Sequence, residues 1–352
     1  MEETIKNILK LAINAPSGHN YQPWRFRIQG SALSLFNLPE RDTTIYNFLQ
    51  RGSYMAHGAL IENILVAASH FQYKGIVSLF PKEEGHNCTA TIVFEPSPEL
   101  KEDTLFASLA QRTTNRKPYK NIPLEPAHRE EIMRISGELA GGAMLRLVED
   151  AAKKKALAGA FSCNERLALE NHAVHQSLFP HVIWSEKEEA EKRSGLYIKT
   201  FELPPPAQIA FRMFRNWTLV KVIGKRVSQS IAKQNAGVYA AASAIGLIAI
   251  PNDSDASFVL AGRLLEKIWL TATRLQLSFQ PVTAVVYLGQ RIIAGERGQF
   301  SKDQAQLIES SYNTVKHEFN ISAETMAMTF RIGYDGNPSA YSSKLPPRIE
   351  LA

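Results

Sequence analysis

The sequence has few cysteines, no long apolar run and no strong excess of one charge. Its 352 residues include two cysteines, Cys88 and Cys163, which are too few for a disulfide framework and suit a reducing compartment. The longest largely apolar stretch, at 238–250, is too short to span a bilayer and is typical of a buried core segment. The opening residues, MEETIKNILK, lack the apolar centre of a signal peptide. These absences predict a cytoplasmic globular protein.

The charge balance is mild. The chain carries 40 Lys and Arg against 34 Asp and Glu, a formal net charge of +6. Such an excess permits an anionic ligand, but it does not indicate a partner that is a nucleic acid or a membrane. The length favours two structural units and allows a core large enough to need no disulfide or metal.

Several common chemical motifs are also missing. No P-loop or Gly-x-Gly-x-x-Gly follows an expected strand, and there is no Gly-x-Ser-x-Gly elbow. Cys163, His172, His175 and His181 fall in one region, but their spacing matches no zinc pattern. We therefore expect no metal site.

Apolar periodicity predicts two sets of helices and strands. Pro96 and Pro98 break the chain after the first set, and a second helix–strand set begins near Glu125. Helices are expected at 5–13, 60–71, 126–139 and 151–170, and strands at 24–28, 33–36, 75–80, 89–94, 145–149 and 245–250.

One stretch of sequence recurs later in the chain. Residues 53–73 and 257–277 align at an offset of 204, with seven of 21 positions identical, among them Gly58/Gly262 and Glu62/Glu266. Two amphipathic helices can share apolar positions by chance, but chance accounts less well for the glycine and the glutamate. We therefore favour an internal duplication, in which the second half carries a long insertion at about 150–235.

The segment APSGHNYQPW at 15–24 predicts a rigid turn, because it combines two prolines with a glycine and a serine. Gly18 lets the backbone approach a flat or crowded group, and Ser17 and Asn20 offer hydrogen-bonding groups. A capped turn, in which Ser and Asn bond their own backbone, is the simpler interpretation.

The segment RTTNR at 112–116 places Arg112, Thr114 and Arg116 at alternate positions. On an extended stretch these side chains point the same way. Two guanidinium groups and a hydroxyl suit a phosphate, because arginine binds phosphate oxygens through paired hydrogen bonds. A solvated basic loop would have the same sequence, so both interpretations stay open at this point.

A longer basic segment, at 212–233, has six Lys or Arg and no acid, with Phe214 and Trp217 among them. A helix lying on a membrane surface has this pattern, and so does an RNA-binding patch. Given the mild net charge, we favour a lid helix near an anionic cofactor or a solvated face.

Taken together, these segments resemble the FMN-dependent nitroreductase family. The turn at 15–24 resembles its Ala-Pro-Ser-x-x-Asn-x-Gln-Pro-Trp signature, and 112–116 resembles its Arg-x-Ser-x-Arg phosphate motif, with Thr114 in place of serine. The segment SKLP at 343–346 resembles the loop that reaches the FMN phosphate, with Lys344 in place of a common arginine. The resemblance covers most of the chain except about 150–235 and 290–325.

The order of the motifs is similar to that of the Acg-like fused members, in which two halves of one chain mimic the usual dimer. The turn lies in the first half and the arginine motif in the second, so one FMN site is implied. The implied fold is α+β and nitroreductase-like, a pseudo-dimer of two unequal halves, 1–103 and 104–352, around mixed sheets flanked by helices. The implied FMN contacts are Pro16, Ser17, Gly18, Asn20, Arg112, Thr114, Arg116, Asn235 and Lys344.

The resemblance implies an oxidoreductase that passes electrons from NAD(P)H through FMN to a small acceptor, a nitroaromatic or quinone-like compound. The flavin carries the hydride chemistry, so no catalytic side chain is assigned. By analogy, the loop at 251–255 is expected to face the redox edge of the flavin. The alternative is a protein that binds or sequesters FMN with little turnover, because the insertion would cover the ring. A monomer is expected, since the usual dimer is fused.

Overall fold

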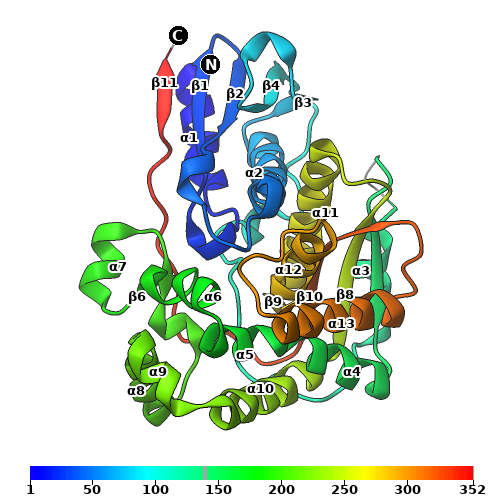
Figure 1. Cartoon of the computed structure of the whole chain (residues 1–352). Helices are drawn as coiled ribbons and strands as arrows, with labels where there is room; N and C mark the ends of the chain where they lie inside the picture. Colours follow the sequence, from blue (N-terminus) through cyan, green and yellow to red (C-terminus); the bar gives the residue numbers. More distant parts are fainter. Residues whose placement is uncertain (138–140, 352) are drawn as a thin grey trace.

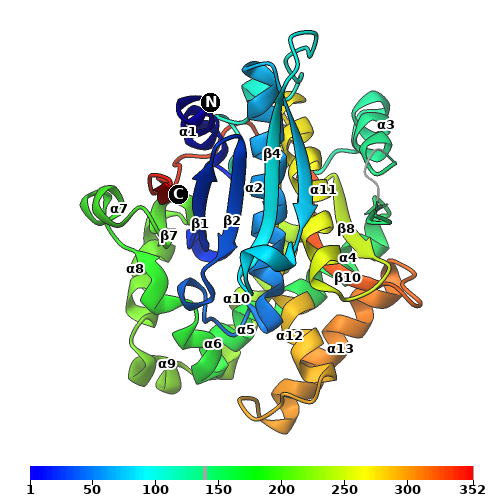
Figure 2. The ribbon, with the colours of Figure 1, turned by 90° about the horizontal axis from the view of Figure 1, so that it is seen from above.

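The computed structural model describes residues 1–137 and 141–351 and contains two main β-sheets flanked by helices, which confirms the predicted α+β class. Two long helices lie between these sheets. α2 (Arg51–His70) packs on the first sheet, α11 (Asp255–Arg274) packs on the second, and the two helices pack on each other. Figures 1 and 2 show this order of layers.

The first sheet has five strands in the order β11-β1-β2-β4-β3. β1 (Trp24–Gln29), β2 (Ala32–Asn37), β4 (Cys88–Pro96) and β3 (Tyr73–Leu79) are antiparallel neighbours, close to their predicted ranges. β11 (Ile349–Leu351) comes from the end of the chain and pairs in parallel with β1. The first sheet therefore includes a strand from the second half of the sequence.

The second sheet has four strands in the order β5-β8-β10-β9. They are β5 (Met144–Val148), β8 (Ala244–Ile250), β10 (Thr325–Gly333) and β9 (Ser278–Pro281). Every residue of β8 is buried, as its uninterrupted apolar sequence predicts for a central strand. α11 covers one face of this sheet, and helices that follow β5 and β9 cover the other.

The remaining helices outside the insertion complete the two cores. α1 (Glu2–Ala12) packs beside α2, because its apolar side chains recur at helical spacing. α3 (Pro126–Ile135) begins where predicted, and the final part of its predicted range, 138–139, lies outside the described residues. α12 (Ala284–Ile293) and α13 (Lys302–Glu318) pack on each other. In the described part of the chain, no helix is long and apolar enough to cross a bilayer.

The predicted insertion is a largely helical substructure, seen in green in the lower part of Figure 1. The single helix predicted at 151–170 is two helices, because the chain turns at Ser162, whose hydroxyl donates to the Gly159 carbonyl at 2.8 Å. The elements of this region are α4 (Ala151–Phe161), α5 (Cys163–Glu170), α6 (His172–Gln176), β6 (Val182–Ile183), α7 (Glu186–Lys192), β7 (Leu196–Tyr197), α8 (Pro205–Phe214), α9 (Trp217–Ile223) and α10 (Lys225–Ala240).

Candidate functional site

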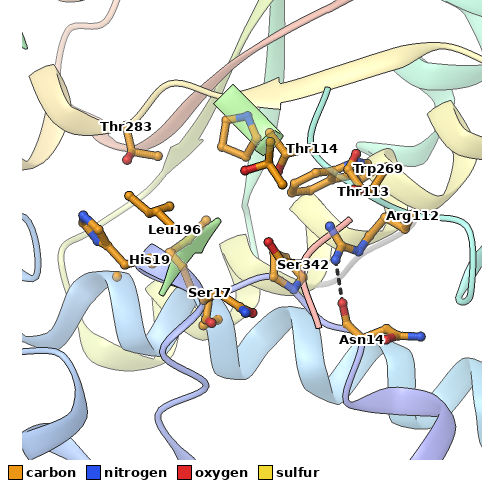
Figure 3. A pocket seen from close by; sticks show the side chains of 18 of the residues that line it. Asn14, Ser17, His19, Arg112, Thr113, Thr114, Leu196, Trp269, Thr283 and Ser342 are labelled. Atoms are coloured by element: carbon orange, nitrogen blue, oxygen red, sulfur yellow. Dashed lines mark hydrogen bonds between the residues drawn. The ribbon is translucent and has the colours of Figure 1, made fainter. Parts of the chain in front are cut away.

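Eight of the nine residues expected to contact the cofactor line one cavity of about 450 Å³. That volume lies within the range of about 300–1,000 Å³ typical of small-molecule sites. In Figure 3, Ser17 from the first half approaches the same space as Arg112 and Thr114 from the second. The eight residues are Pro16, Ser17, Gly18, Asn20, Arg112, Thr114, Arg116 and Lys344.

The turn after α1 is a strained stretch of backbone. His19, Asn20 and Gln22 have positive φ values of 49°, 58° and 52°, a left-handed conformation that costs about 1–2 kcal/mol per residue. Ser17 stabilises the turn, because its Oγ accepts a hydrogen bond from the Gln22 amide at 2.9 Å. A Cβ on Gly18 would lie 2.9 Å from an Asp42 carboxylate oxygen, so this position is crowded.

The end of the chain closes over this turn. Lys344 Nζ donates to Asn20 Oδ1 at 2.8 Å, and Asn20 Nδ2 donates to the Ser343 carbonyl at 2.9 Å. Gln22 Oε1 accepts a hydrogen bond from the Leu345 amide, also at 2.8 Å. Asn20 therefore bonds to the far end of the chain, whereas Ser17 acts as the simpler capped-turn interpretation predicted.

Arg112 is buried between Trp269 and Glu266. Its guanidinium carbon lies 4.3 Å from the Trp269 ring centroid, and its Nε lies 3.1 Å from Glu266 Oε1. The Nε–H is not directed at the carboxylate, so Nε and both Glu266 oxygens lack hydrogen-bond partners among the described residues. Burial raises the pKa of Glu266 to about 7, although Arg112 opposes the rise. Arg112 Nε is thus a buried donor without a hydrogen-bond partner among the described residues.

The other two cations of the cavity form no ion pair within the described part of the chain. Arg116 Nη1 donates to the carbonyl and the hydroxyl of Thr200, at 3.0 and 3.3 Å. Burial, helped by the nearby Arg112, lowers the pKa of Lys344 to about 7. Three cationic side chains therefore line one cavity, with the buried Glu266 carboxylate beside Arg112.

Asn115 holds the cationic segment in place from behind. Its side chain is buried, and Nδ2 donates to Ser278 Oγ at 3.0 Å and to the Gly336 carbonyl at 2.8 Å. These contacts anchor the segment 112–116, which has no regular secondary structure. Arg112, Thr114 and Arg116 then face the cavity, as their alternation predicted.

Another part of the cavity wall is polar, and Arg116 lies close enough to it to act on His19. His19 and Thr283 line it (Figure 3), together with Tyr287. Burial lowers the pKa of His19 to about 3, with His181 and Arg116 adding to the fall, so the imidazole is neutral near pH 7. Tyr287 is 3% exposed, and its hydroxyl has no hydrogen-bond partner among the described residues. An unpaired buried hydroxyl is unfavourable, and a ligand in the cavity would provide a partner.

The insertion forms part of the cavity wall. Gly195, Leu196 and Thr200 line the cavity, and the Arg193 carbonyl accepts a hydrogen bond from Gln22 Nε2 at 2.8 Å. The insertion is therefore attached directly to the N-terminal turn.

Asn235, the ninth predicted contact, does not line this cavity. It lies on α10 and hydrogen-bonds with Glu165, a buried acid that also accepts a hydrogen bond from the Tyr239 hydroxyl at 2.5 Å. The loop at 251–255 is likewise absent from the cavity wall. The described residues contain no group of three or more His, Cys, Asp or Glu placed to hold a metal.

Asn14, Thr113, Ser342 and Trp269 are among the lining residues that were missed from the sequence. Asn14 and Ser342 directly precede the segments 15–24 and 343–346, and Thr113 lies within 112–116 but outside the alternating set. Trp269 lies on α11, far along the chain, and its helical spacing indicates only a core position.

The fold and the cavity define an α+β protein with a cationic small-molecule site. No family model matches the sequence. "Putative NAD(P)H nitroreductase Rv3131" of Mycobacterium tuberculosis is 28% identical over 291 residues, which span 80% of this chain and 76% of that protein. "Putative NAD(P)H nitroreductase acg" from the same organism is 28% identical over 123 residues, 34% of this chain and 37% of that protein. The chain is therefore similar in sequence to proteins named putative NAD(P)H nitroreductases, as its motifs predicted.

Solved structures give weaker likenesses. A nitroreductase with bound FMN from Bacteroides fragilis has a TM-score of 0.38 at 10% identity, covering 69% of this chain and 94% of that one. An FMN-dependent nitroreductase from Clostridium difficile has a TM-score of 0.39 at 12% identity, covering 72% and 100%. Because these TM-scores lie below 0.5, no argument rests on the solved structures.

Proposed function

We propose that the chain is an FMN-dependent oxidoreductase that takes electrons from NAD(P)H and passes them to a nitroaromatic or quinone-like acceptor. The observation that carries this proposal is the convergence of Arg112, Arg116 and Lys344 on one cavity. The names of the sequence relatives suggest the electron donor and the acceptor class.

The lining of the cavity suits FMN. A phosphate dianion beside Arg112 and Lys344 would balance their positive charge. The polar part of the wall, with His19, Thr283 and Tyr287, suits the hydrogen-bonding edge of a neutral ring system. A bound flavin would supply the hydride chemistry, while the chain would hold the phosphate and orient the ring.

We also propose that 1–103 and 104–352 are two copies of one fold that build a single site and act as a monomer. The turn at 15–24 comes from the first copy and the segment 112–116 from the second. The exchange of β11 into the first sheet supports this arrangement, because it ties the two copies together. Light scattering on the purified protein tests the monomer.

Anaerobic reduction of the FMN-loaded protein tests the redox function. We expect NADH or NADPH to bleach the flavin absorbance and a nitroaromatic or quinone to restore it. If neither nicotinamide bleaches a chain that retains FMN, the reductase function fails, while flavin binding stands.

The second candidate is a protein that sequesters FMN. It is favoured by the wall that Leu196 and Thr200 form, and by the hydrogen bond that ties Arg193 to the turn, because a closed wall would keep nicotinamide from the ring. A sequestering protein would retain FMN that dithionite reduces and NAD(P)H does not. The same titration therefore separates the two candidates.

A further inference from the structure

The outer helices of the insertion expose large apolar side chains. α8 and α9 lie at the edge of the molecule, at the lower left of Figure 1, and α8 buries none of its residues. Ile209 and Met213 on α8 are 66% and 54% exposed, and Val222 on α9 is 81% exposed. Ile209 and Met213 are four residues apart and share one face of α8. We call these three side chains the outer apolar patch.

The outer apolar patch lies within a segment that has no acidic residue. Between 203 and 234 there is no Asp or Glu, and within the described part of the chain none of the segment's six cations forms an ion pair with a carboxylate. Arg212 lies over the ring of Trp184 instead, and Lys221 lies over the ring of Trp217. The six are Arg212, Arg215, Lys221, Lys225, Arg226 and Lys233.

The acids near this segment have partners of their own. On α5, which packs against α9 and α10, Glu170 pairs with Arg166. On α7, Glu186 pairs with Lys199 and Glu188 pairs with Lys192. The charge of Arg215 contributes to a lowered pKa of Glu188, but the two side chains form no ion pair. The cations beside the outer apolar patch therefore remain available to an anionic surface.

We propose that the outer apolar patch docks the protein on a membrane surface that contains anionic phospholipids. Apolar side chains beside unpaired cations are what such a surface binds, since the side chains enter the acyl boundary and the cations meet the headgroup phosphates. A nucleic acid would use the cations but gains little from exposed Ile209 and Val222. A second copy would use the apolar side chains but would bring like charges together.

This proposal departs from the expectation that the chain has no membrane partner, which rested on the mild net charge. The total of +6 conceals the local excess, because acids elsewhere offset it. The proposal is independent of the redox function, so either can fail alone.

Flotation with lipid vesicles tests the docking. The full chain should float with vesicles of phosphatidylcholine mixed with phosphatidylglycerol, and not with phosphatidylcholine alone. Ile209→Asp combined with Val222→Asp should weaken this binding by about tenfold or more, because two apolar anchors become anions. Ile293→Asp is the matched control, since Ile293 is 58% exposed on α12, outside the outer apolar patch, and should bind as the parent does.

Charge reversal gives a second, separate measurement. Lys221→Glu with Arg226→Glu should abolish flotation with the anionic vesicles, whereas Lys82→Glu with Lys302→Glu, two exposed lysines elsewhere, should retain it. The proposal is overturned if the anionic vesicles do not bind the parent chain, or if the Ile209 and Val222 variant floats as well as the parent. It is also overturned if light scattering shows that the parent is a dimer and that the Ile209 and Val222 variant is a monomer. The same holds if labelled RNA binds the parent and this variant equally while vesicles bind neither.

Discussion

Gly58 and Gly262 make the same contact from opposite sides of the crossing between α2 and α11. A Cβ on Gly58 would lie 1.9 Å from the Val259 carbonyl oxygen, and one on Gly262 would lie 2.0 Å from that of Met55. Both pairs of equivalent residues are 204 positions apart, the offset of the sequence repeat. The reciprocal contact is what a twofold relation between two copies would produce, and it supports the proposed duplication.

Gly58→Ala should destabilise the protein by about 2 kcal/mol or more, because a backbone carbonyl cannot rotate away from the added methyl group. Thermal unfolding of the purified chain measures the loss. The matched control is Gly159→Ala on α4, where nothing lies within 4 Å of the added Cβ. This control should gain about 0.5–1 kcal/mol from its helix propensity. Equal stability of the two variants would show that the helices do not touch at Gly58.

Arg112→Ala combined with Arg116→Ala should reduce FMN affinity by about a hundredfold or more, because two charge-assisted contacts to the phosphate are lost. Fluorescence titration of FMN measures the affinity. Arg129→Ala with Arg297→Ala removes two exposed arginines outside the cavity and should bind as the parent does. Unchanged FMN affinity in the first variant would place the phosphate elsewhere.

One FMN should bind per chain, because the two halves supply different parts of a single site. The first half provides the turn with Asn20, and the second provides Arg112 and Lys344. Absorbance of flavin released from a weighed amount of saturated protein gives the ratio. A value near two would contradict the single-site arrangement.

FMN affinity should fall by about tenfold between pH 7 and pH 9, because the charges that hold the phosphate change in this interval. Without ligand, Lys344 loses its proton near pH 7, and a bound dianion favours the ammonium form. Binding therefore takes up a proton above pH 7, and it weakens as the pH rises. Ionisation of Glu266, with its pKa raised to about 7, acts in the same direction. Lys344→Arg, which stays charged, should flatten the profile, and an equally steep profile in this variant would exclude Lys344 as the source.

Tyr287→Phe should weaken FMN binding by about tenfold and leave the unliganded protein at least as stable as before, because it removes a buried hydroxyl that has no partner among the described residues. The redox potential of bound flavin should also shift, since a hydrogen bond to the ring is removed. Tyr21→Phe is the matched control: its hydroxyl is also buried and unpartnered but lies outside the cavity. If the parent, Tyr287→Phe and Tyr21→Phe have equal FMN affinities and equal redox potentials of bound flavin, Tyr287 does not contact the flavin.

The regular elements were predictable from the sequence because their signals are local. β8 is apolar throughout because all of its residues are buried, and the apolar residues of α1 recur at helical spacing because one face of this helix is buried. The segments 15–24 and 112–116 could be selected for the same reason, since each contains its own motif. β11 could not be predicted, because three residues of mixed polarity give no periodicity.

Contacts between residues far apart in the sequence could not be predicted from the spacing of residues within a motif. Asn20 and Lys344 hydrogen-bond across 324 positions, and only the family resemblance brought them together in advance. The unpaired hydroxyl of Tyr287 gives no signal in sequence, because α12 has the pattern of an ordinary buried helix. The exposure of Ile209 and Val222 was also hidden, since apolar helical residues indicate burial by default.

The return of the last strand to the first sheet sets when the site can form during synthesis. A ribosome adds residues in order, so Lys344 and β11 appear after every other part of the cavity wall. A growing chain that already contains Arg112 and the N-terminal turn still lacks the third cation. The proposed FMN site is therefore incomplete until the chain has been made beyond Lys344, and removal of the chain from Lys344 onward should weaken FMN binding.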